Sequence, residues 1–502
     1  MVAAIVMITA TGIALALLCF GANGLRGTDQ YWYTAEVEQL LAGQRNIGTV
    51  AFPFHAYHQL IPPPFNHHTP THYVVLPFAA LWGALWGWNI VNFLCSFLVA
   101  ALIGVGVARC TDLRAGALAY AVTILLPLQV WVATQQYLES SLALLVTVGL
   151  FIFSFQPHGA RKWFSLLVVF LIAYCCRASF LPALLLIPLG YIAYSRPLSR
   201  KTLGIGIGML LLALGGLAGY QHYFSPDPAL TFTRYMSAYV PNVSNSMEVL
   251  YFLEDPALNP QHLLAKAQRG LWNQFFRKAS MQVFYLPFNM LALLTLWGLW
   301  RYRSRYPQGF PIAALVLVFL HLLTICLRAN DFRFLQVVSP VVLMGALIAV
   351  GSSSLLRHRT RWIGIAALAL VSLTSVDIIL IRKIQRDVAR DASNRAALSH
   401  FLDNAIPRTD PVIVATSHYS NKEFLLSYAV RPRLVLFTGP NHGYSAEEHL
   451  AMRKAVKGKW LLAEPDSPLI SIFKAEAAQE TTAPLPEPYE RLHVYRLPEA
   501  TA

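Results

Sequence analysis

Long apolar runs recur along most of this 502-residue chain, and they constrain its fold more than any other feature. A helix needs roughly 20 mostly apolar residues to cross a bilayer. The chain is 56% hydrophobic and only 13% charged, whereas soluble domains average about 25% charged residues. The sequence therefore predicts an α-helical polytopic membrane protein with about eleven transmembrane helices. The runs cover residues 2–20, 89–108, 116–133, 140–155, 164–176, 180–194, 203–220, 283–300, 311–327, 335–350 and 363–381.

Basic residues between these runs predict the orientation of the protein. Lysines and arginines are enriched in cytoplasmic loops, so short basic gaps indicate the cytoplasmic side. This assignment places the N-terminus inside, the loops 23–88 and 221–281 outside, and the C-terminal region outside. The first run lacks a basic head and a clear cleavage site, which predicts a retained helix. The basic residues behind the net charge of +14 are then explained by the orientation of the protein in the membrane, and a nucleic-acid partner is not needed to explain them. The basic gaps contain Arg109, Arg114, Arg161, Lys162, Arg196, Arg200, Lys201, Arg301, Arg303, Arg305, Arg357, Arg359 and Arg361.

The composition changes at residue 382 and divides the chain into two predicted domains. Residues 1–381 form the transmembrane domain, and residues 382–502 form a small extracytoplasmic α/β domain. Short β-prone segments at 411–417, 433–439, 459–464 and 491–497 alternate with helical stretches. The apolar stretch 72–86 is too short to span a bilayer, and we predict an interfacial helix there.

Two carboxylates stand at predicted outer ends of spans. Asp29 follows the first span, and Glu139 begins the run that reaches residue 155. Two interpretations of Asp29 are open. It caps the N-terminus of a helix, or it is a general base whose pKa rises through partial desolvation at the membrane surface. A purely structural role is also open for Glu139, because its negative charge would interact favourably with the positive end of a helix. Because ionisable groups near the membrane are costly, the pair together indicates a functional site.

Three arginines fall on the predicted outer side, where the charge rule disfavours them. They are Arg177, Arg328 and Arg333. An ion pair with Asp331 is one explanation. A lipid phosphate is the other, because guanidinium binds phosphate through two parallel hydrogen bonds.

Histidines gather in the predicted first outer loop, between residues 51 and 73. Their spacing fits no strict zinc template, and no cysteine lies among them. We favour a polar, aromatic-lined loop that shapes a substrate site, with a metal site as the weaker alternative. The weak metal candidates are His55, His58, His67 and His68, and His72 completes the group.

Four short motifs carry a family resemblance. They are Thr28-Asp29-Gln30-Tyr31, His68-Thr69-Pro70-Thr71-His72-Tyr73, Gln136-Tyr137-Leu138-Glu139, and Asp331-Phe332-Arg333-Phe334 with Pro340. In its layout the chain resembles the GT-C superfamily of polytopic glycosyltransferases. It is most similar to the branch of protein O-mannosyltransferases and lipid A aminoarabinose transferases, including their C-terminal extracytoplasmic domain.

The resemblance implies an inverting transfer of a sugar from a polyprenyl-phosphate-linked donor to an extracytoplasmic lipid, polysaccharide or protein. It implies Asp29 as general base, Glu139 as a second catalytic carboxylate, and Arg333, Arg177 and Arg328 as ligands of the donor phosphate. It implies that Tyr31, His68, Tyr73 and Tyr137 shape the substrate site. It also implies a bacterial inner membrane as the location. A divalent metal stays open, although Gln30 stands where many relatives carry a second acid. The alternatives are a transporter or flippase for lipid-linked sugars, and an O-antigen polymerase or ligase.

Overall fold

The computed structural model describes most of the helical bundle and parts of the C-terminal domain. Most of the predicted span 311–327, about half of the loop 23–88 and nearly all of the loop 221–281 lie outside the described residues. The described residues are 1–21, 24, 28–41, 43, 70–176, 180–195, 199–224, 279–307, 309–314, 335–353, 358–407, 410, 412–415, 435–438, 446–447, 450, 453, 459–477 and 490–498.

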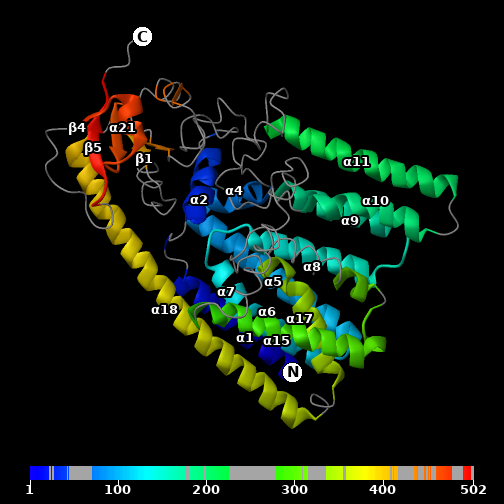
Figure 1. Ribbon diagram of the computed structural model, residues 1–502. Coiled ribbons are helices and arrows are strands. Elements are labelled where there is room, and N and C mark those ends of the chain that lie inside the picture. Colours follow the sequence, from blue (N-terminus) through cyan, green and yellow to red (C-terminus); the bar gives the residue numbers. More distant parts are fainter. Residues whose placement is uncertain are drawn as a thin grey trace.

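Helices of this bundle follow the predicted apolar runs (Figure 1). Within the described residues, α1, α5, α11, α17 and α18 are long and apolar enough to cross a membrane, and the bent pair α6 and α7 makes a sixth candidate. The chain is therefore a multi-pass membrane protein. The helices are α1 (Val2–Gly21), α2 (Thr28–Leu41), α4 (Pro70–Trp82), α5 (Ala84–Cys110), α6 (Leu113–Ile124), α7 (Pro127–Ala133), α8 (Glu139–Phe155), α9 (Ala160–Cys176), α10 (Leu181–Tyr194), α11 (Arg200–Phe224), α15 (Ala279–Arg301), α17 (Leu335–Ser352) and α18 (Arg359–Ala405), with a 3-10 turn η2 (Arg303–Arg305).

The predicted continuous span 116–133 is broken in the structure. The helices α6 and α7 meet at an angle of 52°. Leu126 has extended backbone angles, and Pro127 is the first residue of α7. Proline disfavours helical angles in the residue before it and suits the first helical position, so the break lies where the sequence requires it.

The predicted interfacial helix 72–86 corresponds to α4 and the start of α5. Gly83 separates the two helices with a φ of +83°, a conformation that side chains disfavour. A Cβ at Gly87 would lie 2.7 Å from the backbone nitrogen of Ala79, so the two helices approach closely just after the turn. This turn packs α4 across the first turns of α5.

The two ends of the bundle carry different side chains. At one end, Arg109 lies over the rings of Phe151 and Phe155, 5.2 and 5.5 Å from their centroids. At the same end Lys162 donates to the carbonyl oxygen of Phe153 (2.6 Å). The helices α2 and α4 lie at the other end, nearer the C-terminal sheet, whereas the N-terminus lies away from it (Figure 1). Arg109 and Lys162 therefore lie at the end of the bundle that is away from α2 and α4.

Helix α18 continues through the predicted domain boundary at residue 382. Its 47 residues give a length of roughly 70 Å at 1.5 Å per residue, more than a bilayer needs. One helix thus crosses the membrane and enters the C-terminal domain, where Leu398, Leu402 and Ile406 pack under the sheet.

Within its described residues, the C-terminal region forms one five-stranded sheet with helices packed on it. Its strand order is β2-β1-β3-β5-β4, with β1 parallel to β2 and β3, and β5 antiparallel to β3 and β4. The end of α18 covers one face, and α21 packs on the other through Leu469 and Phe473. The elements are β1 (Val412–Ala415), β2 (Val435–Thr438), β3 (Trp460–Ala463), α21 (Pro468–Phe473), β4 (Glu476–Ala477) and β5 (His493–Arg496).

Candidate functional site

Glu139 lies at the first turn of α8, where the sequence predicts a functional carboxylate. Its side chain is only 1% exposed. The partial positive charge of a helix N-terminus favours a carboxylate at this position. Two residues earlier, the ring of Tyr137 stacks on Trp131 with centroids 5.3 Å apart, which holds the preceding turn against α7. Tyr73, the other described residue of the predicted substrate-shaping group, lies in the first turn of α4 and is 37% exposed.

A hydrogen bond between two glutamine side chains joins the first turn of α2 to the turn before α8. The Nε2 group of Gln30 donates to Oε1 of Gln135, and both side chains are fully buried. Asp29 is the neighbour of Gln30 in α2, and its side chain lies outside the described residues, as does that of Tyr31. The backbone that carries Asp29 is thus fixed beside the turn that carries Glu139.

Helix α5 holds the same turn from its other side. The Nδ2 group of Asn92 donates to the carbonyl oxygen of Gln135 (2.5 Å), and Nε2 of Gln136 donates to Oδ1 of Asn89 (2.9 Å). All four side chains are fully buried. Because an unpaired buried amide costs about 1–3 kcal/mol, these bonds strongly favour one arrangement of α2, α5 and α8.

A buried contact between a histidine and a glutamate joins α2 to α4. Nε2 of His72 lies 2.7 Å from Oε2 of Glu36, and both side chains are 0% exposed. The rings of Tyr33 and Trp88 lie 5.8 and 5.2 Å from the imidazole centroid. The indole N–H of Trp88 donates to the carbonyl oxygen of Tyr33 (3.1 Å).

The sequence analysis groups His72 with the outer-loop histidines and also places it at the start of the predicted interfacial helix 72–86; the structure bears out the helical placement. His72 belongs to α4, which begins at Pro70, a residue suited to the first helical turn. The signal that would have found the pair is an acid on α2 and a lone histidine on an otherwise apolar helix. Each would need a partner if both helices were buried.

The predicted phosphate-binding arginines lie outside the described residues, but the structure describes helix ends next to two of them. Arg177 follows Cys176, the last residue of α9, and Cys176 Sγ lies 3.6 Å from Oγ1 of Thr71 in α4. Arg333 precedes α17, where Nε2 of Gln336 donates to Oε1 of Gln129 in α7 (2.6 Å). Both ends therefore face the same end of the bundle as Glu139; Arg328 has no described neighbour in sequence.

The metal candidates His55, His58 and His67 lie outside the described residues, as does His68. Within the described ranges, no three His, Cys, Asp or Glu side chains gather as ligands for a metal ion. The five cysteines found there are free thiols, and Cys326 lies outside these ranges.

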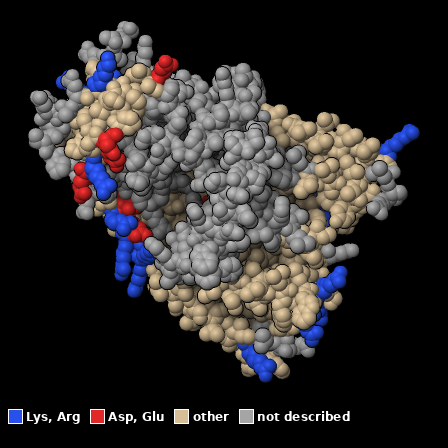
Figure 2. Space-filling view, in the orientation of Figure 1, with Lys and Arg blue, Asp and Glu red and all other residues tan. Residues whose placement is uncertain are grey.

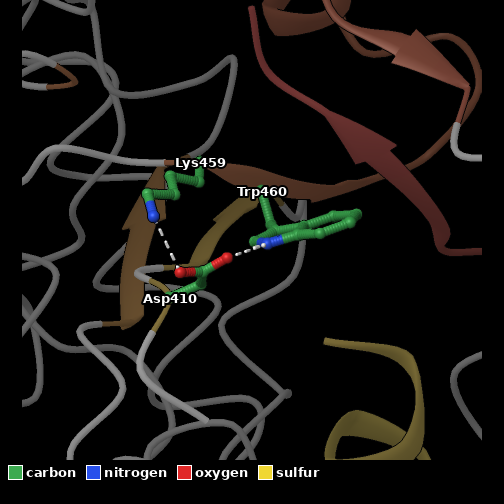
Figure 3. A network of polar contacts seen from close by, with 3 residues as sticks. All are labelled: Asp410, Lys459 and Trp460. Atoms are coloured by element: carbon green, nitrogen blue, oxygen red, sulfur yellow. Dashed lines mark hydrogen bonds and ion pairs between the residues drawn. The ribbon is translucent and has the colours of Figure 1, made fainter. Parts of the chain in front are cut away.

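A second polar network lies in the C-terminal domain (Figure 3). Asp410 accepts hydrogen bonds from Nζ of Lys459 (2.9 Å) and from Nε1 of Trp460 (3.0 Å). Burial raises the pKa of the Asp410 carboxyl, but these two hydrogen bonds and the charges of Lys459 and Arg496 outweigh it and lower the pKa below its ordinary value. The network precedes β1 and opens β3, whereas ligands of parallel sheets bind beyond the carboxyl ends of the strands. Its place indicates a structural role.

Comparison with known proteins gives a fold likeness. No protein-family model matches the chain, and no curated protein sequence matches it. ArnT from Cupriavidus metallidurans in the apo state is similar over 97% of both chains, with a TM-score of 0.58 and 13% identity. Its structure bound to undecaprenyl phosphate gives the same coverage and TM-score with 14% identity. An oligosaccharyltransferase from Archaeoglobus fulgidus tethered to an acceptor peptide has a TM-score of 0.52 and 12% identity, covering 92% of this chain and 69% of that one.

These likenesses extend over nearly the whole chain, the C-terminal domain included in the range covered. They concern architecture, because identities of 12–14% show the fold alone. The chain therefore shares the fold of ArnT and of this oligosaccharyltransferase, and the fold expected from its sequence is confirmed.

Proposed function

We propose that this chain is an integral membrane glycosyltransferase that transfers a sugar from a polyprenyl-phosphate-linked donor to an extracytoplasmic acceptor, with inversion. The fold likeness to ArnT, a lipid A aminoarabinose transferase solved with undecaprenyl phosphate, supports this class of donor. The likeness to an oligosaccharyltransferase tethered to an acceptor peptide supports a reaction that has a separate acceptor. The acceptor is a lipid, a polysaccharide or another protein. The glycosyltransferase itself lies in a bacterial inner membrane, with its C-terminal domain in the periplasm.

The observation that carries the proposal is the contact between Gln30 and Gln135. It brings the helix turn that contains Asp29 to the turn that precedes Glu139. Two carboxylates from distant parts of the sequence then serve one site at the end of the bundle.

In the proposed reaction, an acceptor hydroxyl or amine attacks the anomeric carbon of the donor sugar. The bond from that carbon to the phosphate oxygen breaks, and polyprenyl phosphate leaves. Asp29 takes the proton of the acceptor, a step that typically contributes about 100- to 10,000-fold to the rate. Glu139 orients the acceptor or the base. Arg333, Arg177 and Arg328 hold the donor phosphate, where guanidinium offers paired donors for the developing charge.

The Glu36–His72 pair positions the proposed base. It lies on the same helix as Asp29, two turns further along, and it fixes that helix against α4. Catalytic groups need placement to within about 0.5 Å, and a buried polar contact between two helices is a rigid means of achieving it. No step of this proposal uses a metal ion.

The test is an Asp29→Asn variant assayed in liposomes for transfer from a radiolabelled polyprenyl-phosphate sugar. We expect a loss of about 100- to 10,000-fold in turnover. The matched control is Glu38→Gln, which removes an exposed carboxylate from the same helix and should leave turnover within about twofold. If a folded Asp29→Asn protein turned over at nearly the wild-type rate, Asp29 would not be the general base.

The donor site has its own test, because phosphate binding is separable from proton transfer. An Arg333→Ala variant should raise the donor KM by tenfold or more, by the usual strength of charge-assisted hydrogen bonds, about 1.5–3 kcal/mol. The acceptor KM should change little. Arg301→Ala, at the basic end of the bundle, is the matched control. An unchanged donor KM for Arg333→Ala contradicts the assignment.

A further inference from the structure

Three exposed cations stand where α18 leaves the apolar part of its sequence. They are Arg382, Lys383 and Arg386, and the helix before them is mostly apolar from Ile363 onward, with Asp377 as its single charged residue. In Figure 2, Lys and Arg side chains project from the flank of the molecule along which α18 runs. This position is on the sheet side of the bundle, where the charge rule disfavours basic residues.

A hydrogen bond places these cations at the surface of the membrane. Nε2 of Gln385 donates to the carbonyl oxygen of Phe20 (2.9 Å), in the last turn of the transmembrane helix α1. Ile381 lies at the same level, because a Cβ added to Gly21 would approach it to 2.6 Å. The three cations are therefore level with the end of a membrane span, where lipid headgroups lie.

The cations continue the lipid-facing surface of α18. Ile381 and Ile384 are buried on the side of α1, whereas Ile378 and Ile379 are 43% and 70% exposed. Residues four apart lie on one face of a helix, so Arg382 and Lys383 extend the row of Ile378 and Ile379, and Arg386 follows Arg382. A lipid whose chain packs on the isoleucines would have its headgroup beside these cations.

Their charge is not neutralised within the described part of the protein. The next cation along the helix, Arg390, lies 3.5 Å from Asp387 and 3.7 Å from Asp391. Among the described residues, no carboxylate lies within 4.0 Å of the three lower cations. The carboxylates of α18 therefore lie further from the membrane than the lipid headgroups, whereas the three cations lie level with the headgroups.

We propose that Arg382, Lys383 and Arg386 form a binding site for the phosphate of an anionic phospholipid in the leaflet on the sheet side. Arginine binds phosphate through two hydrogen bonds, and each basic residue near an anionic surface adds attraction. Such a site fixes the depth at which α18 crosses the membrane and hence the height of the domain that it carries. The proposal is independent of the proposed glycosyl transfer.

The test measures lipid binding to the full-length protein, delipidated in detergent, by native mass spectrometry. The wild type should bind phosphatidylglycerol more tightly than zwitterionic phosphatidylcholine. The triple variant Arg382→Gln/Lys383→Gln/Arg386→Gln should lose about fivefold in affinity for phosphatidylglycerol per cation removed. Its affinity for phosphatidylcholine should not change.

The matched control removes three exposed cations from the C-terminal domain, Lys474→Gln/Arg491→Gln/Arg496→Gln, and should keep the preference for phosphatidylglycerol. A triple variant that binds phosphatidylglycerol like the wild type would overturn the proposal. So would an equal loss in the control, since net charge would then explain the binding. Full competition by inorganic phosphate, or selective occupancy by polyprenyl phosphate, would contradict the assignment to bulk phospholipid.

Discussion

The bundle and the C-terminal domain each contain a polar cluster, and the two are built in opposite ways. In the bundle, the Glu36–His72 pair and the Gln30–Gln135 bond are fully buried and join helices that are distant in sequence. In the domain, Lys459 is 63% exposed where it meets Asp410, and the two residues lie just before the neighbouring strands β3 and β1. Buried polar groups are costly unless satisfied, whereas exposed ion pairs contribute little. The bundle cluster therefore determines one helix arrangement, and the domain cluster only supports a sheet edge.

The largest expected effect comes from breaking the buried contact between Glu36 and His72. Glu36→Ala removes the buried carboxyl group that lies 2.7 Å from Nε2 of His72, and losing one partner of a buried polar contact costs about 1–3 kcal/mol, and more where that group is charged. We expect a large drop in the thermal unfolding temperature of the detergent-purified protein. Glu38→Ala, on the exposed side of the same helix, should cost about 0.5 kcal/mol or less. Equal effects of the two substitutions would show that the pair is not buried as described.

The next effect concerns the junction between α2 and the turn before α8. Gln135→Leu leaves the amide of Gln30 without its acceptor, at a cost of about 1–3 kcal/mol. Because the bond fixes the helix of the proposed base, glycosyl transfer should fall more than stability alone explains. A lower unfolding temperature with unchanged turnover would show that the bond between Gln30 and Gln135 does not position the catalytic site.

A smaller effect is expected at Asp410 in the domain. Asp410→Ala removes the acceptor of the Trp460 indole and should destabilise β1 and β3 by about 1 kcal/mol. Hydrogen exchange of these strands in the full-length protein measures the change, with the bundle helices as internal reference. Slower or unchanged exchange in both strands would contradict the structural role.

The pH dependence of the domain follows from the same carboxyl. Because the folded-state pKa of Asp410 lies below its ordinary value, its ionised form is favoured by folding. Its contribution is complete above the unfolded pKa of about 3.9 and is lost as the pH falls through the folded value. Exchange of β1 and β3 in the wild type should therefore rise more steeply below pH 4 than in Asp410→Ala. Parallel pH profiles would contradict this linkage.

The smallest effect separates the two partners of Asp410. Lys459→Ala removes an exposed ion pair and should change the stability of the sheet by about 0.5 kcal/mol or less. The same exchange experiment compares it with Asp410→Ala. A Lys459→Ala effect as large as that of Asp410→Ala would show that the exposed pair, rather than the indole bond, stabilises this edge.

The helices and strands were largely predictable because their signals are local. The run 140–155 predicts α8 to within one residue, and the segment 411–417 contains β1. The break before Pro127 was missed, although proline chemistry explains it, because hydrophobicity continues across it. The boundary at residue 382 marks a real change in composition, but a helix can cross such a change without ending.

The site was predictable only in part. Glu139 could be selected because a charged residue in an apolar run is conspicuous, and the structure places it buried at a helix start. The contacts that assemble the site could not be selected, since Gln30, Gln135 and Asn92 are uncharged and common in loops and helix ends. Tertiary packing decides which amide side chains form hydrogen bonds with one another, and these pairs cannot be predicted from a single sequence. The roles of Asp29, Arg177, Arg328 and Arg333 stay predictions.

The central claim is that the starts of α2 and α8 serve one catalytic site, and a double-mutant cycle tests it most directly. Transfer rates are measured for Asp29→Asn, Glu139→Gln and the double variant under the same conditions. Residues that act as a unit show losses that do not multiply, so the double variant should be about as slow as the slower single variant. Losses that multiply fully in folded proteins would mean that the two carboxylates act independently, and would contradict the account.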